Sequence, residues 1–277
     1  KIINKIYCDR LDNVWIAPLD MSIYKYDRQQ SPFIYYGPVS SKPDGMKDSG
    51  IECLYIDKKG NIWFGHHFSG LDKYDPITGR YIHFPHLPGS NRGPSSGWIN
   101  GICEDVHGNL WIGTSQNGLD CYDSQSGIFS NIRSDPSSPE GLKSNNIRCL
   151  IARGNGDLWL ASQYKGLQIF DTQKKIFRMV DFDSTGIQGI HTLYEDTHGK
   201  LWIGTLENGL YGLLFEQERL TAIEHFVNDP HDPTSLGNNN ISDIIRPEVY
   251  DTSALWIATD NGLERLDLVT RTFTHFY

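Results

Sequence analysis

The sequence predicts an all-β protein, a β-propeller of four-stranded antiparallel blades. Six of the seven tryptophans occur in versions of one motif, which reads Asn-Leu-Trp-Ile-Gly-Thr at residues 109–114. The isoleucines that open the first four repeats, Ile3, Ile51, Ile99 and Ile147, are each 48 residues apart. Such a period, with aromatic residues in short runs and glycines between them, is typical of propeller blades.

Each repeat contains four short runs with strand character, which we label A to D. Run A reads Ile-x-x-(Leu/Ile), run B holds the tryptophan, run C reads Leu-x-x-(Tyr/Phe)-Asp in most copies, and run D is aromatic, as at residues 177–180. Asp, Asn, Pro and Gly lie between the runs, for example at 105–109 between A and B and at 75–79 between C and D. These residues favour tight turns, so the runs are predicted to pair as a meander.

The six repeats predict blades at about 1–38, 50–86, 98–134, 146–182, 189–228 and 240–277, within a single domain 1–277. One blade cannot bury its two apolar faces alone, so the run B tryptophan is expected to lie between neighbouring blades. We expect one six-bladed ring, or an incomplete part of a seven-bladed one.

Composition restricts the function classes. The net charge of −9 argues against nucleic acid as a main partner. No stretch reaches the roughly 18 apolar residues of a membrane span, and no signal peptide is visible. The chain starts inside a repeat and looks like an excised piece of a larger protein. The five cysteines form no CxxC pair and are interpreted as buried free thiols.

The repeat pattern Asp-x-x-Gly-(Asn/Asp)-(Leu/Ile)-Trp-(Ile/Leu/Phe)-(Gly/Ala)-(Thr/Ser)-x-x-x-Gly-Leu resembles the two-component-regulator propeller repeat. The connections at 134–147 and 228–241 also resemble the Asp-Pro-x-x-Pro-x-Ser-Leu linker of that family. The resemblance covers essentially the whole chain. Members usually have seven blades, often in two tandem propellers.

The resemblance implies the periplasmic sensor region of a hybrid two-component histidine kinase of Bacteroidetes. We therefore expect a non-catalytic sensor, the extracytoplasmic part of an inner-membrane protein, without a cofactor. It is expected to bind a carbohydrate such as an oligosaccharide, or to relay its signal to the kinase. Its expected partners are that ligand and neighbouring domains of the parent sensor, with a homodimer possible.

Candidate ligand residues lie where the repeats differ, in the B–C turns and D–A connections expected around the channel mouth. The residue after the first Ile of run A is polar and varied, which would suit a ligand-lined mouth or only a solvated funnel. The predicted ligand-binding residues are Trp98, Asn100, Arg148, His191, His66, Gln116, Tyr164 and Glu207. Trp98 lies outside the repeat motif, and an exposed indole beside amides would suit a sugar ring, although it would also suit a loop anchor.

No catalytic or metal-binding residue is predicted. His66 and His67 are adjacent and would point to opposite sides of a strand. The recurring aspartates Asp57, Asp105 and Asp196 are interpreted as turn residues that bind backbone amides. Two alternatives stay open. One is an enzyme similar to streptogramin lyase, in which His191, His66 and Glu207 would act. The other is a protein-interaction scaffold.

Overall fold

The computed structural model describes residues 3–8, 14–18, 23–27, 31–36, 46, 50–135, 137–162, 165–181, 187–246 and 253–276. Within these ranges the chain forms 24 strands, and they assemble into six four-stranded sheets. Consecutive strands pair antiparallel in every sheet, so each repeat is a meander, as predicted. The chain divides into two compact units, which are described separately: residues 37–180, and residues 1–36 with 181–277.

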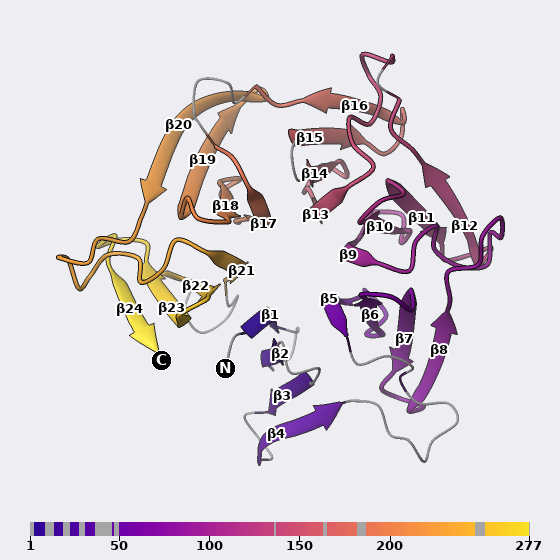
Figure 1. Ribbon diagram of the computed structural model, residues 1–277, viewed down its shortest axis with the longest axis horizontal. Helices are drawn as coiled ribbons and strands as arrows, with labels where there is room; N and C mark the ends of the chain where they lie inside the picture. The colour runs from indigo at the N-terminus through magenta and orange to yellow at the C-terminus, as the bar shows by residue number, and fades with distance from the viewer. Residues whose placement is uncertain are drawn as a thin grey trace. The chain divides into compact units, whose positions relative to one another are not determined.

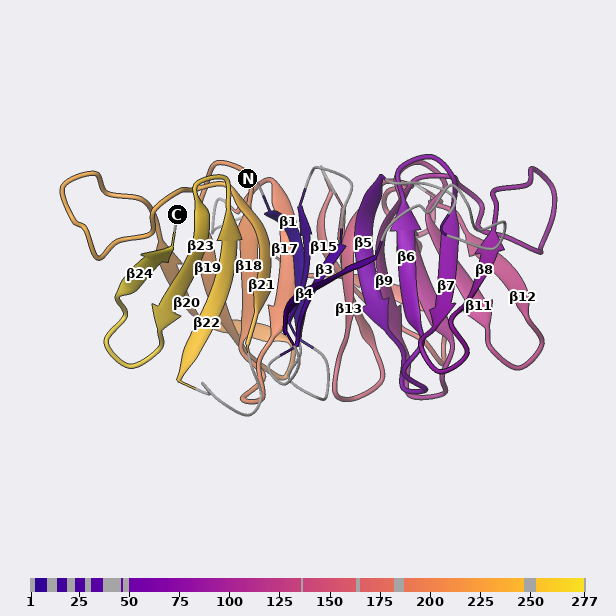
Figure 2. The same cartoon turned by 90° about the horizontal axis from the view of Figure 1, so that it is seen from below.

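The unit of residues 37–180 contains three sheets (Figures 1 and 2). The second repeat forms β5 (Ile51–Ile56), β6 (Ile62–His66), β7 (Leu71–Asp75) and β8 (Arg80–Phe84). The third forms β9 (Ile99–Glu104), β10 (Leu110–Thr114), β11 (Leu119–Asp123) and β12 (Ile128–Ile132). The fourth forms β13 (Ile147–Ala152), β14 (Leu158–Ser162), β15 (Gly166–Asp171) and β16 (Ile176–Met179). Strand β9 lies between β5 and β13 on the inner side of this unit.

The other unit also contains three sheets. The first repeat forms β1 (Ile3–Cys8), β2 (Val14–Pro18), β3 (Ile23–Asp27) and β4 (Ser31–Tyr36). The fifth forms β17 (Ile190–Glu195), β18 (Leu201–Thr205), β19 (Leu210–Glu216) and β20 (Arg219–Phe226). The sixth forms β21 (Ile241–Ile245), β22 (Ala254–Thr259), β23 (Gly262–Asp267) and β24 (Phe273–Phe276). Here β21 lies between β17 and β1.

The propeller class is confirmed, but the prediction of six blades is wrong. Five sheets, from β5–β8 to β21–β24, are blades with side chains described along all four strands. The sheet β1–β4 is present as backbone, but only the side chains of Lys5, Ile6, Tyr7 and Trp15 are described in it. The structure therefore supports five blades and one further sheet, arranged as two units of three sheets. Six copies of a motif predict six sheets; they do not by themselves establish six packed blades in one ring.

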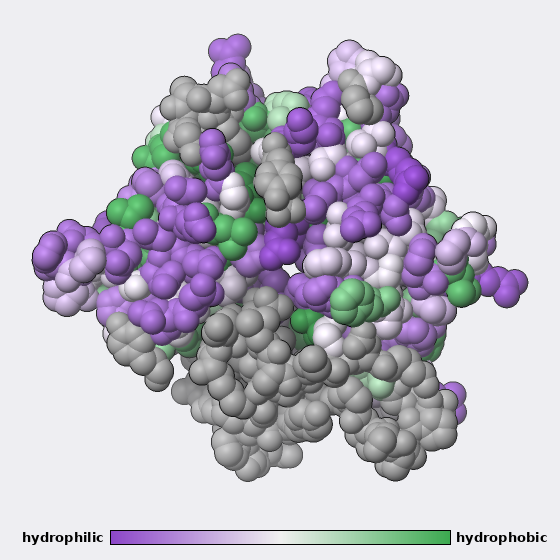
Figure 3. Space-filling view, in the orientation of Figure 1, coloured by the Kyte–Doolittle hydropathy of each residue, from purple (hydrophilic) through white to green (hydrophobic). Residues whose placement is uncertain are grey.

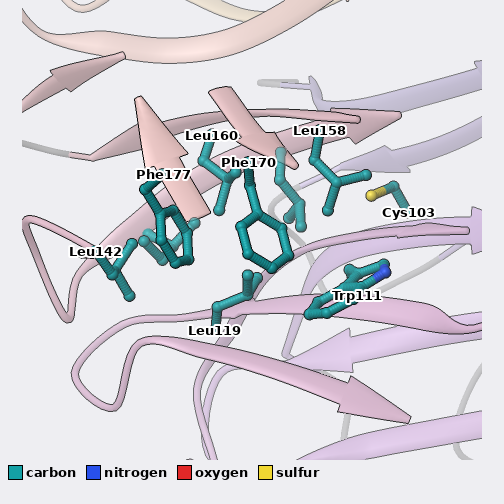
Figure 4. Close-up of a cluster of buried hydrophobic side chains, with 10 residues drawn as sticks. Cys103, Trp111, Leu119, Leu142, Leu158, Leu160, Phe170 and Phe177 are labelled. Carbon is teal, nitrogen blue, oxygen red and sulfur yellow. The ribbon is translucent and has the colours of Figure 1, made fainter. Parts of the chain in front are cut away.

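The repeat tryptophan is buried, and an aspartate holds its indole. Trp111 lies with Leu119, Leu142 and Phe170 in one apolar cluster (Figure 4), and its ring centroid is 5.0 Å from that of Phe170. Its Nε1 donates a hydrogen bond of 2.9 Å to Asp105 Oδ2. The other oxygen of Asp105 accepts the backbone amides of residues 107 and 109. The same aspartate thus closes the A–B turn and holds the core indole in place.

The same arrangement recurs in two other blades. Trp63 Nε1 donates to Asp57 at 2.8 Å, and Trp202 Nε1 donates to Asp196 at 3.2 Å. The prediction that these aspartates are turn residues is confirmed, because each also accepts backbone amides of its turn. The bond to the indole was not predicted. It explains why Asp and Trp recur together six positions apart.

The small residue two positions after the tryptophan is a packing requirement. A Cβ added at Gly113 would lie 2.8 Å from Ile147 Cγ2, on the first strand of the next blade. At Gly204 it would lie 2.5 Å from Ile241 Cγ2. The isoleucine that opens each of these blades therefore packs directly against the glycine of the preceding blade. This contact explains why the opening isoleucine and the small residue after the tryptophan both recur.

The cysteines are free, as expected. Cys53, Cys103 and Cys149 are buried and Cys121 is half-buried, while the side chain of Cys8 lies outside the described residues. Burial raises the pKa of the Cys121 thiol to about 11. Cys121 is therefore protonated at neutral pH, and the buried thiols serve as small apolar side chains.

The substitution Asp105→Ala should lower the free energy of unfolding by about 1–3 kcal/mol at pH 7, because it leaves a buried indole N–H without an acceptor. Burial raises the pKa of this carboxyl, but the hydrogen bonds from Trp111, Asn109 and His107 outweigh it and hold the pKa below its ordinary value. A lowered carboxyl pKa gives stability that is present above the unfolded pKa of about 3.9 and is lost as the pH falls through the folded pKa. Urea unfolding from pH 7 to pH 3 should show the two proteins converging at acid pH, and a constant difference would contradict this reading.

Candidate functional site

The B–C turns and the ends of the D–A connections lie side by side in the described blades. The amide of His67 donates to Gly50 O at 2.9 Å, and the amide of Ser115 donates to Trp98 O at 3.2 Å. The glycine of the turn adds a second link, since Gly118 N donates to Asn145 O at 2.8 Å. Gly118 has a φ of +84°, and a Cβ there would lie 2.3 Å from Ile132 O. A glycine is therefore required for the connection to approach the turn.

The varied polar position after the first Ile of run A is a β-bulge. The pairing between the first two strands shifts there in the described blades, as between Ile51 and Cys53 or between Ile190 and Thr192. A bulge re-aims the side chain of the extra residue. The residues at this position are Glu52, Asn100, Arg148, His191 and Ser242.

Two of these bulge residues connect neighbouring blades. Asn100 Nδ2 donates to Ile147 O at 2.8 Å, and His191 Nδ1 lies 2.9 Å from Ile241 O. In both cases the partner is the carbonyl of the isoleucine that opens the next blade. At least two residues at this varied position therefore have a structural role, so the variation does not by itself indicate ligand binding.

An aromatic cluster lies on the same face of the second and third repeats. The ring of His67 is 3.8 Å from that of Trp98 and 4.2 Å from that of Phe68, measured between centroids. His67 Nδ1 lies 2.8 Å from Glu52 Oε1. Phe68 is 77% exposed, whereas Trp98 and His67 are half-buried. We call these four residues the aromatic platform; Figure 3 shows a hydrophobic patch near the ends of β5 and β6 amid largely hydrophilic surface.

The indole of Trp98 has unused hydrogen-bonding capacity. Its Nε1 is buried and has no hydrogen-bond partner among the residues that the structure describes, and the same is true of Asn100 Oδ1 and Ser69 Oγ. Buried polar atoms are normally paired, so such atoms need a partner that the chain itself does not supply, such as water or a ligand hydroxyl. One unpaired donor and one unpaired acceptor thus lie two residues apart at the start of β9.

The other predicted ligand residues are more dispersed. Gln116 is exposed in the B–C turn of the third repeat, and Arg148 is half-buried at the bulge of the fourth. His191 and Glu207 belong to the other compact unit, where Glu207 is exposed with a φ of +75°. Tyr164 lies outside the described residues. Among the predicted residues, the structure places Trp98 within the platform and Asn100 two residues after it on β9.

His66 is not available to a ligand. Its side chain is fully buried, and its Nε2 lies 3.1 Å from Asp72 Oδ2. The other oxygen of Asp72 lies 2.5 Å from His83 Nδ1. The three side chains join the second, third and fourth strands of one blade. His66 points away from the platform that its neighbour His67 builds, as expected for adjacent strand residues.

Other blades use the position of Asp72 to hold a D–A connection. Asp120 accepts the amide of Ser95 at 2.7 Å, and Glu264 accepts that of Gly237 at 2.9 Å. Burial raises the pKa of both carboxyls above the ordinary value. Removal from water, partly offset by hydrogen bonds, accounts for the direction. These buried carboxyls are loop anchors and not an acid–base pair.

The sequence interpretation identified Trp98 and the face on which it lies, but it missed the pairing of Glu52 with His67. Both residues occupy positions that vary between repeats. No spacing in the sequence, however, predicts that a bulge residue contacts a turn residue 15 positions away. Their neighbourhood depends on the pairing of β5 with β6. The described residues contain no cluster of His, Cys, Asp or Glu suited to a metal ion. They also contain no helix that is long and apolar enough to span a membrane.

A family model described as "Two component regulator propeller" matches this chain at residues 45–68, 93–116 and 186–207. Each match covers the first two runs of a repeat, including the tryptophan in the second and third repeats and in the fifth. No match was found among curated protein sequences. The repeats of the chain are thus of this family's type.

Solved structures share the fold at low identity. The extracellular domain of a hybrid two component system from B. thetaiotaomicron is 22% identical, with a TM-score of 0.71 over 98% of this chain and 34% of that one. That of a one component system from the same organism is 20% identical, with a TM-score of 0.70 over 99% and 35%. Virginiamycin B lyase from Staphylococcus aureus is 15% identical, with a TM-score of 0.66 over 99% and 83%. The chain spans about a third of the length of the first two.

Proposed function

This chain is built from repeats of the two component regulator propeller family, and from that premise we propose that it is a ligand-sensing part of the extracytoplasmic region of a hybrid two-component system. The similarity to extracellular domains of a hybrid two component system and of a one component system supports the class and the compartment. The proposed ligand is a carbohydrate, bound without being chemically changed. The chain would then pass the occupied state to a histidine kinase through neighbouring domains.

The aromatic platform is the observation that carries the proposal. A sugar ring has apolar faces and polar edges, and proteins bind it with aromatic rings flanked by a few polar groups. Phe68 offers an exposed ring face, and Trp98 offers an indole N–H without a partner. Glu52 lies 2.8 Å from His67 and can accept hydroxyl hydrogens. Phe68 stacks on His67, whose ring in turn lies against that of Trp98, so the exposed ring is held in place by its neighbours.

The lyase alternative is less well supported by these residues. An elimination needs a base and an acid within reach of the substrate. His66, one of the three residues considered for that role, is completely buried, and its Nε2 lies 3.1 Å from Asp72 Oδ2 without the geometry of a hydrogen bond. The likeness to the lyase is one of fold. The titratable groups of the platform, His67 and Glu52, lie 2.8 Å apart and pair with each other, and neither is among those three residues.

Isothermal calorimetry of the whole chain against plant and host oligosaccharides tests the proposal. We expect at least one glycan to bind, and Phe68→Ala or Trp98→Ala to weaken that binding roughly tenfold or more, which corresponds to about 1.4 kcal/mol. Ile77→Ala is the control, because Ile77 is an exposed apolar residue on the C–D turn of the same blade and lies outside the platform. Silence across the panel, or equal affinity in the platform variants and the control, would refute binding at the platform.

A further inference from the structure

The D–A connections do more than join blades: three of them cap the outer strand of the next blade. Phe129 N on β12 donates to Asn91 O at 2.9 Å, and Phe177 N on β16 donates to Glu140 O at 2.8 Å. Phe273 N on β24 donates to Thr234 O at 2.8 Å. In each case a connection of 14 residues, 85–98, 133–146 or 227–240, reaches over an outer strand. An otherwise open sheet edge is thereby closed.

Capping also buries apolar side chains. The three capped phenylalanines are 2–6% exposed. Leu142 packs on Phe177 and Leu236 packs on Phe273 within the same apolar clusters. These two caps therefore have two parts: a backbone carbonyl that accepts the outward amide of the strand, and a leucine in the same apolar cluster as the ring.

Strand β20 holds the equivalent position without such a cap among the described residues. Ile223 pairs with Leu213 on β19, just as Phe177 pairs with Phe170 and Phe273 with Leu266. Ile223 is 44% exposed, and its amide has no hydrogen-bond partner within the described part of the chain. The connection that leads to this blade is shorter, ten residues from 180 to 189.

The anchor for a D–A connection is also changed in this blade. Where Asp120 and Glu264 accept a loop amide, the fifth repeat has Tyr211. Tyr211 is buried and stacks on His225 with centroids 3.9 Å apart, and His225 in turn bonds Asn208 O. The described residues of this blade thus lack the carboxylate anchor, although its edge keeps the amide and the apolar side chain that a cap would cover.

We propose that the edge of β20 at Ile223 is a docking site for a turn-containing segment of another polypeptide, of the type seen in the cap at residues 229–237 of this chain. Such a segment supplies a backbone carbonyl to Ile223 N and, close after it, a leucine to cover Ile223 and Leu214, which is 39% exposed. That cap defines its chemistry as an Asp- and Pro-containing stretch ending in Ser-Leu-Gly, folded by turns in which Asp232 N donates to Asp229 O and Ser235 N donates to Asp232 O. Main-chain hydrogen bonding at an exposed sheet edge, with a pocket for a side chain, is a common basis of peptide recognition.

A fluorescein-labelled peptide with the sequence of residues 229–237 tests the site by fluorescence anisotropy with the whole chain. We expect saturable binding that Ile223→Lys weakens at least tenfold. Ile128→Lys is the matched control, because Ile128 is 47% exposed on β12, an outer strand whose edge is already capped. A peptide with lysine in place of its leucine should not bind.

Three results would overturn the inference. One is no binding at millimolar peptide, and another is equal binding to the Ile223→Lys and Ile128→Lys proteins. The third is a dimer of the chain in sedimentation that Ile223→Lys dissociates, since this would assign the edge to a second copy. Circular dichroism melts of both variants show whether a loss of binding reflects loss of the fold.

Discussion

Replacement of Trp111 by alanine should lower the free energy of unfolding by about 3–5 kcal/mol, the cost of a large cavity in a well-packed core. The indole is almost fully buried and lies edge-on against Phe170. Lys175 Nζ lies 4.4 Å from its ring centroid, which adds a cation–π contact. The bond to Asp105 would also be lost. Urea or thermal unfolding followed by circular dichroism measures the loss.

Trp98→Ala is the control for that experiment. Trp98 is half-buried at the platform, and its Nε1 has no partner to lose. Trp98→Ala should lower the free energy of unfolding far less than Trp111→Ala does, but it should weaken ligand binding. If the two variants lose equal stability, the division between a repeat tryptophan that holds blades together and a platform tryptophan that binds ligand is wrong.

The fold was predictable because each repeat has the same residue types at the same spacing, so the same local structure is indicated several times. A tryptophan that recurs with an aspartate before it and a glycine after it predicts strand, turn and blade packing together. The hydrogen bond from Trp111 to Asp105 and the contact between Gly113 and Ile147 show the physical reasons. The number of packed blades was not predictable in this way, because it depends on how sheets meet and not on how each one forms.

The site was predictable only in part, because it consists of the residues that do not repeat. Trp98 stood out as the tryptophan outside the motif. His66 was the predicted ligand residue, yet it is buried against Asp72, and it is His67 that stacks on Phe68 and lies against Trp98. Alternation along a strand predicts that the two side chains point to opposite sides. Which of them is buried also depends on its polar neighbour Asp72, which lies on β7.

Replacement of Asp243 by alanine is expected to cost ~3 kcal/mol, because this residue links three sheets of one unit and is buried. Its Oδ2 accepts the amide of Ile6 on β1 at 2.8 Å, and its Oδ1 accepts the hydroxyl of Thr192 on β17 at 3.2 Å. Lys5 Nζ lies 3.5 Å from the same carboxylate. Alanine would leave a backbone amide, a hydroxyl and an ammonium group without their acceptor.

A double-mutant cycle with Thr192→Val separates this role from a general loss of packing. Thr192 loses one bond to Asp243, so its substitution should cost less, and the pair should show a coupling energy of about 0.5 kcal/mol or more. Asp260→Ala, at an exposed turn residue of the same repeat, should be close to neutral. Additive effects of Asp243→Ala and Thr192→Val would mean that the carboxylate does not join the inner strands, and the sheet β1–β4 would then need another attachment to β21.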